Sequence, residues 1–151
     1  MRLLGIDMGT RRVGVALSDP TGTIAQGLTV IPRRSWEQVL GAIADLARIH
    51  QVEGIVVGLP LRLEGGEGEA AAEARRFAAR LARVVEVPVV LEDERLSTAE
   101  ADRRMVEAGV RRDDRRARRD AVAAALILQK ALDRRRARRA GGEETIGGDA
   151  G

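Results

Sequence analysis

The sequence predicts an α/β fold in which helices flank one mixed sheet. Three apolar segments joined by short turns come first, at residues 3–6, 13–17 and 23–31, and predict an antiparallel meander. Two further apolar segments, 54–59 and 87–91, each follow a helical segment, as parallel strands linked by crossovers do. Three antiparallel strands followed by two βα crossovers form the five-stranded mixed sheet of an RNase H-like fold.

The first two helices are predicted from a cap and from apolar spacing. Ser35 and Gln38 form a capping-box pattern, and apolar residues at helical spacing continue to about His50. A second helix is expected from about Glu69 to Val85. Its expected buried stripe consists of Ala74, Phe77, Leu81 and Val84.

Two more helices are expected in the last third of the chain. Ser97 and Glu100 form a second capping-box pattern, which predicts a helix that ends near Ala108. An arginine-rich link over residues 111–119 is expected to lead into the final helix, which Asp120 would open. That helix is apolar nearly all round and should therefore pack against the sheet.

Length and composition indicate one domain. The 151 residues suffice for a single core, which we place at 1–139, and residues 140–151 have little to bury and should form a disordered tail. The chain has no cysteine, which excludes a disulfide and a thiolate zinc site. We expect a cytoplasmic protein without membrane contact, because neither a bilayer-spanning apolar segment nor a signal-peptide pattern is found.

The positive charge is concentrated late in the chain. The net charge is only +3, but arginines crowd residues 111–119 and 134–139, which favours a polyanionic partner. The alternative is that arginine is simply the preferred cation of this chain, since Lys130 is its only lysine. Trp36 and Phe77 are the only aromatic residues, so base stacking is not expected and a nucleic acid would be held by its backbone.

The first turn of the chain carries candidate site residues. Asp7 follows the first strand where it leaves the core, a place where α/β sheets present functional groups, although aspartate also begins ordinary turns. Gly9 permits a tight turn and the close approach of a phosphate. Thr10, Arg11 and Arg12 add a hydroxyl and two guanidinium groups.

Acidic residues from three distant segments can converge at one end of the predicted sheet. They are Asp7, the pair Asp93 and Glu94 after the fifth strand, and Asp120, which could also simply suit a helix dipole. Neighbouring carboxylates repel one another unless a cation joins them, and hard oxygen ligands select Mg²⁺ or Mn²⁺. Two such ions would activate water and stabilise the leaving oxygen of a phosphodiester.

These segments resemble the signature blocks of the YqgF-type family, described as Holliday-junction resolvases and pre-16S rRNA nucleases. The resemblance implies that Asp7, Glu94 and Asp120 are the metal-binding catalytic acids, with Asp93 as a flanking residue that could exchange roles with Glu94. It also implies that Arg12 and Arg95 hold the scissile phosphate and that the loop after Pro60 is flexible. Our predicted substrate-binding set is Gly9, Thr10, Arg11, Arg12, Arg62 and Arg95. The blocks fall in family order within residues 3–133: Gly5–Ala16, Ser18–Asp19, Val57–Pro60, Asp93–Thr98 and Asp120–Leu128.

The resemblance implies a divalent-metal-dependent endonuclease that acts on structured RNA and matures the 5′ end of 16S rRNA. Cleavage of branched DNA is the alternative within this class, and the sequence leaves monomer and homodimer open. Residues 7–10 also resemble the first phosphate loop of actin-like ATPases, which usually need a second similar domain. A non-catalytic RNA-binding factor would explain the arginines but leave the acids without a purpose.

Overall fold

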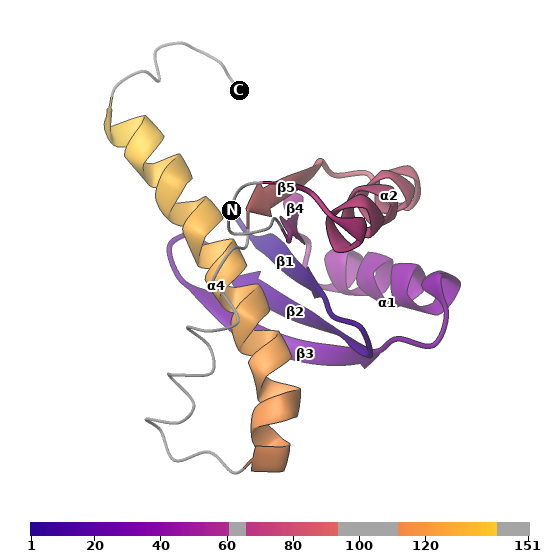
Figure 1. The fold of residues 1–151 in the computed structure, drawn as a ribbon. Helices are drawn as coiled ribbons and strands as arrows, with labels where there is room; N and C mark the ends of the chain where they lie inside the picture. Colours follow the sequence, from indigo (N-terminus) through magenta and orange to yellow (C-terminus); the bar gives the residue numbers. More distant parts are fainter. Residues whose placement is uncertain (61–65, 94–111, 142–151) are drawn as a thin grey trace.

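The computed structural model describes residues 1–60, 66–93 and 112–141, with only the backbone given for residues 112–119. Its sheet has five strands in the order β3-β2-β1-β4-β5 (Figure 1). β1 pairs antiparallel with β2 and parallel with β4, so it is the central strand, as its apolar sequence predicts. The predicted RNase H-like topology is confirmed. The strands are β1 Leu3–Met8, β2 Arg12–Ser18, β3 Ala25–Pro32, β4 Gly54–Leu59 and β5 Val89–Asp93.

Helices cover both faces of the sheet. α1 (Trp36–Ile49) and α2 (Glu69–Val84) lie on one face, and α4 (Arg112–Ala140) crosses the other (Figure 1). The cap predicted for α1 is present, because the Ser35 hydroxyl accepts a hydrogen bond from the Gln38 amide at 3.2 Å. The helix predicted over 97–108 and the tail from 142 lie outside the described residues. None of the described helices is long and apolar enough to cross a bilayer.

The core consists of one apolar cluster on each face. Side chains alternate along β1: Leu4 and Ile6 pack with α1 and α2, and Leu3 packs with α4. The two aromatic rings belong to the first face, where Trp36 and Phe77 meet edge to face at 5.6 Å. The two rings therefore pack against each other on this face of the sheet.

Several details of the sequence prediction are wrong. β3 runs over Ala25–Pro32 instead of 23–31, and β5 runs over Val89–Asp93 instead of 87–91. Val84 does not complete the buried stripe of α2, because it is the last residue of the helix and is 52% exposed. The final helix begins at Arg112 instead of Asp120, so the predicted link over 112–119 is helical. Arginine is a good helix former, and nothing in that segment stops a helix.

α4 lies very close to the sheet because glycines line the face beneath it. A Cβ on Gly14 would stand well inside 3.0 Å of the Asp120 carbonyl oxygen, a distance that real Cβ atoms essentially never show. A Cβ on Gly5 would be 2.7 Å from the Leu128 Cβ. The backbone of α4 therefore rests directly on β1 and β2, and a side chain at Gly14 would push it away.

We expect Gly14→Ala to destabilise the fold by about 3 kcal/mol or more, because the added methyl meets helix backbone that has no rotamer to yield. Gly41→Ala is the matched control. It lies within α1 with nothing within 4 Å of an added Cβ, and should stabilise the protein by up to about 1 kcal/mol. Urea unfolding of both variants measures the difference. Equal effects of the two substitutions would contradict the close contact.

Candidate active site

Asp7 is a buried carboxylate within β1. It is 8% exposed and lies opposite Gly14 of β2 in the antiparallel register. Cross-strand partners share a face, and Gly14 faces α4, so the Asp7 side chain also lies on the α4 face. Asp7 is the last buried residue of β1, which ends at Met8, so it lies where the strand leaves the core, as predicted, and its carbonyl begins the turn that follows.

Asp120 of α4 meets this end of the sheet. Its carbonyl lies over Gly14, and its Oδ2 accepts a hydrogen bond from Arg12 Nε at 2.8 Å. Its Oδ1 would be 3.8 Å from a Cβ on Gly9. Asp120 lies more than two turns inside the helix, so the first-turn dipole interpretation is wrong. Asp7 and Asp120, distant in the sequence, are thus neighbours on one face.

The turn between β1 and β2 is held rigidly beside these acids. The Gly9 amide donates to the Asp7 carbonyl at 3.1 Å and to the Arg12 carbonyl at 3.0 Å. A Cβ on Gly9 would lie 2.5 Å from the Arg12 carbonyl oxygen, so this position requires glycine. Thr10 and Arg11 are exposed at the tip, where a ligand can reach them.

Arg33 also secures this turn, although no sequence pattern singled it out. One guanidinium nitrogen donates to the Gly9 carbonyl at 2.8 Å, and another forms an ion pair with Glu73 of α2. The Arg33 amide donates to the Arg11 carbonyl at 2.9 Å. The side chain is only 16% exposed, so it links the turn to α2 from within the structure.

The structure separates the acidic residues at the end of β5. Asp93 has the same strand parity as Val89 and Leu91, which pack with the α1 and α2 face, so its side chain lies on the face away from Asp7. Glu92 lies on the α4 face, where its buried carboxylate forms an ion pair with Arg134. Glu94, Arg95 and Arg62 lie outside the described residues, so their predicted roles remain predictions.

The donor atoms present suit a hard cation. Asp7 and Asp120 offer carboxylate oxygens, the ligands that Mg²⁺ and Mn²⁺ prefer. Within the described ranges no group of three metal-ligating side chains occurs. The two acids therefore fit part of a metal site, and the third ligand of the prediction, Glu94, is outside the part of the chain described.

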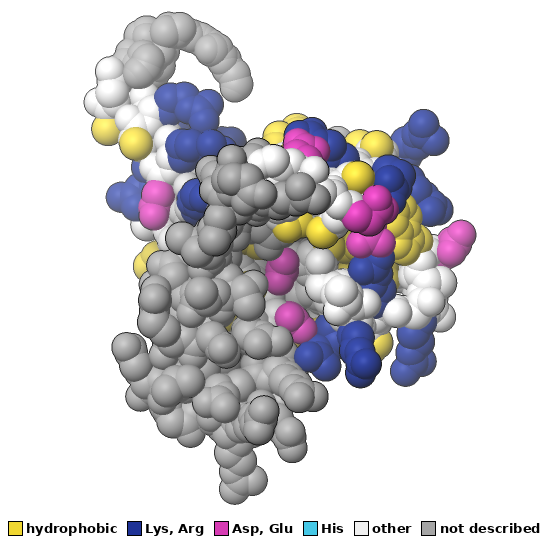
Figure 2. Space-filling view, in the orientation of Figure 1, with side chains coloured by type: hydrophobic (Ala, Val, Ile, Leu, Met, Phe, Trp, Pro, Cys, Tyr) yellow, Lys and Arg dark blue, Asp and Glu magenta, His cyan; other side chains and the backbone are white. Residues whose placement is uncertain are grey.

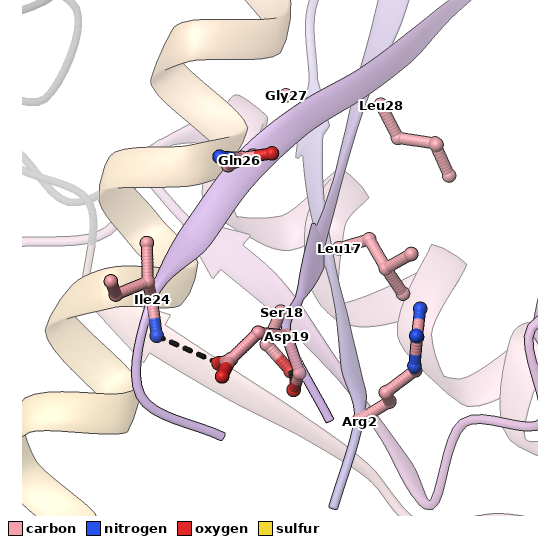
Figure 3. Close-up of a pocket in the computed structure, with 8 residues that line it drawn as sticks. All are labelled: Arg2, Leu17, Ser18, Asp19, Ile24, Gln26, Gly27 and Leu28. Carbon is pink, nitrogen blue, oxygen red and sulfur yellow. Dashed lines mark hydrogen bonds between the residues drawn. The ribbon is translucent and has the colours of Figure 1, made fainter. Parts of the chain in front are cut away.

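The block formed by Ser18 and Asp19 lies at the other end of β2 and has a structural role. The buried Ser18 hydroxyl accepts from the Leu3 amide at 2.9 Å. Asp19 accepts from the amides of Thr23 and Ile24 at 2.8 and 2.9 Å, beside a hollow of about 270 Å³ (Figure 3). The hydrogen bonds from Ile24, Thr21 and Thr23 hold the pKa of Asp19 well below its ordinary value.

The topology defines the class of this protein as RNase H-like, and solved structures share that fold. *Thermus thermophilus* RuvC in complex with a Holliday junction substrate superposes with a TM-score of 0.58 and 17% identity, covering 91% of this chain and 96% of that one. The fowlpox virus Holliday junction resolvase gives 0.54 and 14%, covering 89% and 99%. At these identities the likeness concerns the fold alone.

The chain belongs to the RuvX family, whose profile is described as Holliday junction resolvase and matches residues 1–134. This confirms the predicted YqgF-type resemblance. A *Syntrophus aciditrophicus* protein named "putative pre-16S rRNA nuclease" is 47% identical over 133 residues, covering 88% of this chain and 89% of that protein. A *Myxococcus xanthus* protein of the same name is 48% identical over 136 residues, covering 90% of each chain.

We expect Arg33→Gln to destabilise the protein by about 1–3 kcal/mol, because the variant leaves the Glu73 carboxylate and the Gly9 carbonyl without their charged donor. Arg34→Gln is the control, because Arg34 is the exposed neighbour and the same charge is removed. Chemical unfolding of both variants tests this. A loss no larger for Arg33→Gln than for Arg34→Gln would show that the turn does not depend on Arg33.

The Asp19 turn should make stability depend on acid pH. A lowered pKa in the folded state stabilises the fold above the ordinary value of 3.8, and this contribution is lost as the pH falls below it. We expect Asp19→Asn to be less stable than the wild type at pH 7, with a smaller gap at pH 2.5. Urea midpoints of both proteins at both pH values measure this difference in stability. If Asp19 acts without titrating, the difference will be the same at pH 2.5 and at pH 7.

Proposed function

We propose that this protein is a divalent-metal-dependent endonuclease that cleaves structured RNA, with maturation of the 5′ end of pre-16S rRNA as its task. The observation that carries the proposal is that Asp7 of β1 and Asp120 of α4 lie next to each other where the helix packs on the sheet, beside a turn that carries Arg11 and Arg12. The names of its relatives supply the RNA substrate.

The charges of the site support a metal. Phosphates attracted by Arg11 and Arg12 would be repelled by the neighbouring carboxylates unless a cation lay between them. Asp7, Asp120 and the predicted third ligand Glu94 would hold Mg²⁺ or Mn²⁺, and we propose two ions. When bound, such ions activate water and stabilise the charge of the leaving oxygen.

The residues around the acids would orient the substrate. Arg12 donates a hydrogen bond to the Asp120 carboxylate. This contact fixes the position of the carboxylate and places a positive charge at the mouth of the site. Thr10 and Arg11 are exposed where a phosphate would enter. Arg33 holds the Gly9 carbonyl and so keeps the turn in place. We propose that Arg62 and Arg95 complete the phosphate contacts.

Cleavage of branched DNA is the second candidate, favoured by the description of the family as Holliday junction resolvases. Symmetric cleavage of a four-way junction needs two sites in a dimer. Mass in solution and a comparison of structured RNA with a four-way DNA junction, both with Mn²⁺, separate the candidates. A protein that remains a monomer on the junction and cuts only RNA would support the first.

We expect Asp7→Asn and Asp120→Asn each to slow Mn²⁺-dependent cleavage of a labelled pre-16S 5′-leader RNA by at least about a thousandfold. That corresponds to about 4 kcal/mol of lost transition-state stabilisation. RNA binding should persist or tighten, because a negative charge near the phosphates is removed. Asp45→Asn, a charge-matched control on the exposed surface of α1, should cleave as the wild type does.

Thermal melting with Mn²⁺ tests metal binding by these variants separately from cleavage. Mn²⁺ should raise the melting temperature of the wild type and of Asp45→Asn, but not that of Asp7→Asn. A wild type that binds the RNA yet shows no metal-dependent cleavage and no metal stabilisation would make the protein a binding factor. Cleavage unchanged in Asp7→Asn would also refute the proposed site.

A further inference from the structure

The last turns of α4 form a second basic surface, remote from Asp7. Arg134, Arg135, Arg136, Arg138 and Arg139 lie in this part of the helix, where Figure 2 shows Lys and Arg side chains gathered. Arg138 and Arg139 suit the negative end of the helix dipole, which is a sufficient reason for basic residues in the last turn. The dipole does not account for Arg135, which is a full turn earlier.

The pairing of the arginines differs between the two faces of the sheet. On the α1 and α2 face, most arginines are paired with acids: Arg48 pairs with Asp45 at 2.9 Å and Arg76 with Glu69 at 3.0 Å, while Arg83 forms no ion pair with a described residue. Among the arginines of α4 whose side chains the structure describes, only Arg134 is paired in this way, through Glu92. The other four form no ion pair with any residue that the structure describes: Arg135, Arg136, Arg138 and Arg139.

The excess positive charge borders a cavity of about 410 Å³. Arg134, Arg135 and Arg138 line one side, and the edge strand β5 contributes Val90, which is 53% exposed. Burial and the nearby Arg139 and Arg138 lower the pKa of Arg135, although Glu53 opposes this. Crowded like charges at a cavity are stabilised by a bound polyanion, because it replaces their mutual repulsion with attraction.

The helix fixes the separation between this surface and the candidate active site. Arg138 follows Asp120 by 18 residues, which is five turns, so both lie at the same angle around α4. The residues between them at that angle, Ala124, Ile127 and Ala131, pack on the sheet, so a nucleic acid that reaches both surfaces must pass along the flank of the helix. At 1.5 Å per residue their separation along the axis is roughly 27 Å. A B-form duplex would need about 8 base pairs to span it, using about 3.4 Å per pair, and an A-form RNA duplex, whose rise per pair is smaller, needs somewhat more.

We propose that Arg135, Arg138 and Arg139 form a second docking surface for the phosphate backbone of a nucleic acid, about 27 Å along α4 from Asp120. The inference rests on the proposed function in that the same substrate would reach both surfaces. The surface selects substrates by length, because a helix shorter than about 8 base pairs cannot contact it while lying at the acids.

The test compares two triple variants of the full chain. One is Arg135→Gln, Arg138→Gln and Arg139→Gln. The control is Arg48→Gln, Arg76→Gln and Arg83→Gln on α1 and α2, which removes the same charge and also alters the last turns of two helices. Circular dichroism checks that both fold. Binding is measured in EDTA, where metal-dependent cleavage is absent, on RNA hairpins with stems of about 20 and about 5 base pairs.

We expect the α4 variant to bind the long stem at least about tenfold more weakly at low salt. The fall of its log K with log salt concentration should be less steep than that of the wild type, by about two to three in slope, because three phosphate contacts are lost. Binding of the short stem should change no more than in the control variant. Equal weakening by both variants, no weakening by the α4 variant, or no binding by the wild type would each overturn the proposal.

Cleavage assays keep this inference separate from the proposed function. Selective weakening by the α4 variant, without Mn²⁺-dependent cleavage by the wild type, would support the docking surface and reject the nuclease. Cleavage by the wild type, with the α4 variant binding the long stem equally well, would reject the surface and keep the nuclease. If both proposals are correct, the α4 variant should cleave the long stem with a raised KM and an unchanged kcat.

Discussion

The contact on which the rest of the structure depends is the one between the backbone of α4 and Gly14 of β2. Because no side chain separates them, the helix lies against the sheet, and the Asp120 carbonyl rests over the residue that pairs with Asp7. The acids are neighbours because a helix and a strand can approach closely here. A site formed in this way is positioned by rigid elements instead of by a loop, as precise catalysis requires.

That contact also arranges the charges of the molecule. Burial beneath α4 makes an isolated carboxylate at Asp7 unfavourable, so positive charge must be supplied nearby. Arg12 supplies part of it by pairing with Asp120, and Arg33 secures the turn without entering the site. The buried acids and the arginine that pairs with Asp120 therefore lie together at one end of the sheet.

Much of the fold could be predicted because its signals are local. The strands, the helices that link the last two of them, and the cap at Ser35 follow from patterns within a few residues. The start of α4 could not, because residues 112–119 are Arg and Asp with a single Ala and carry no apolar periodicity that would mark a helix. Nor could Arg33, whose importance depends on two partners distant in the chain. For the acids, the sequence indicated that Asp7 and Asp120 would meet, but only strand parity placed Asp93 on the other face.

The abundance of arginine raised the question of whether its clusters reflect function or compositional bias. Bias would add arginines to solvated surfaces, but it would not decide which of them receive an acidic partner. α2 carries most of its arginines beside acids such as Glu67 and Glu69, so that face presents little net charge. At the end of α4 only Arg134, through Glu92, has such a partner among the described residues, although the same amino acid is used. This difference in pairing, which the sequence alone does not reveal, makes the α4 end the side of the molecule that attracts a polyanion.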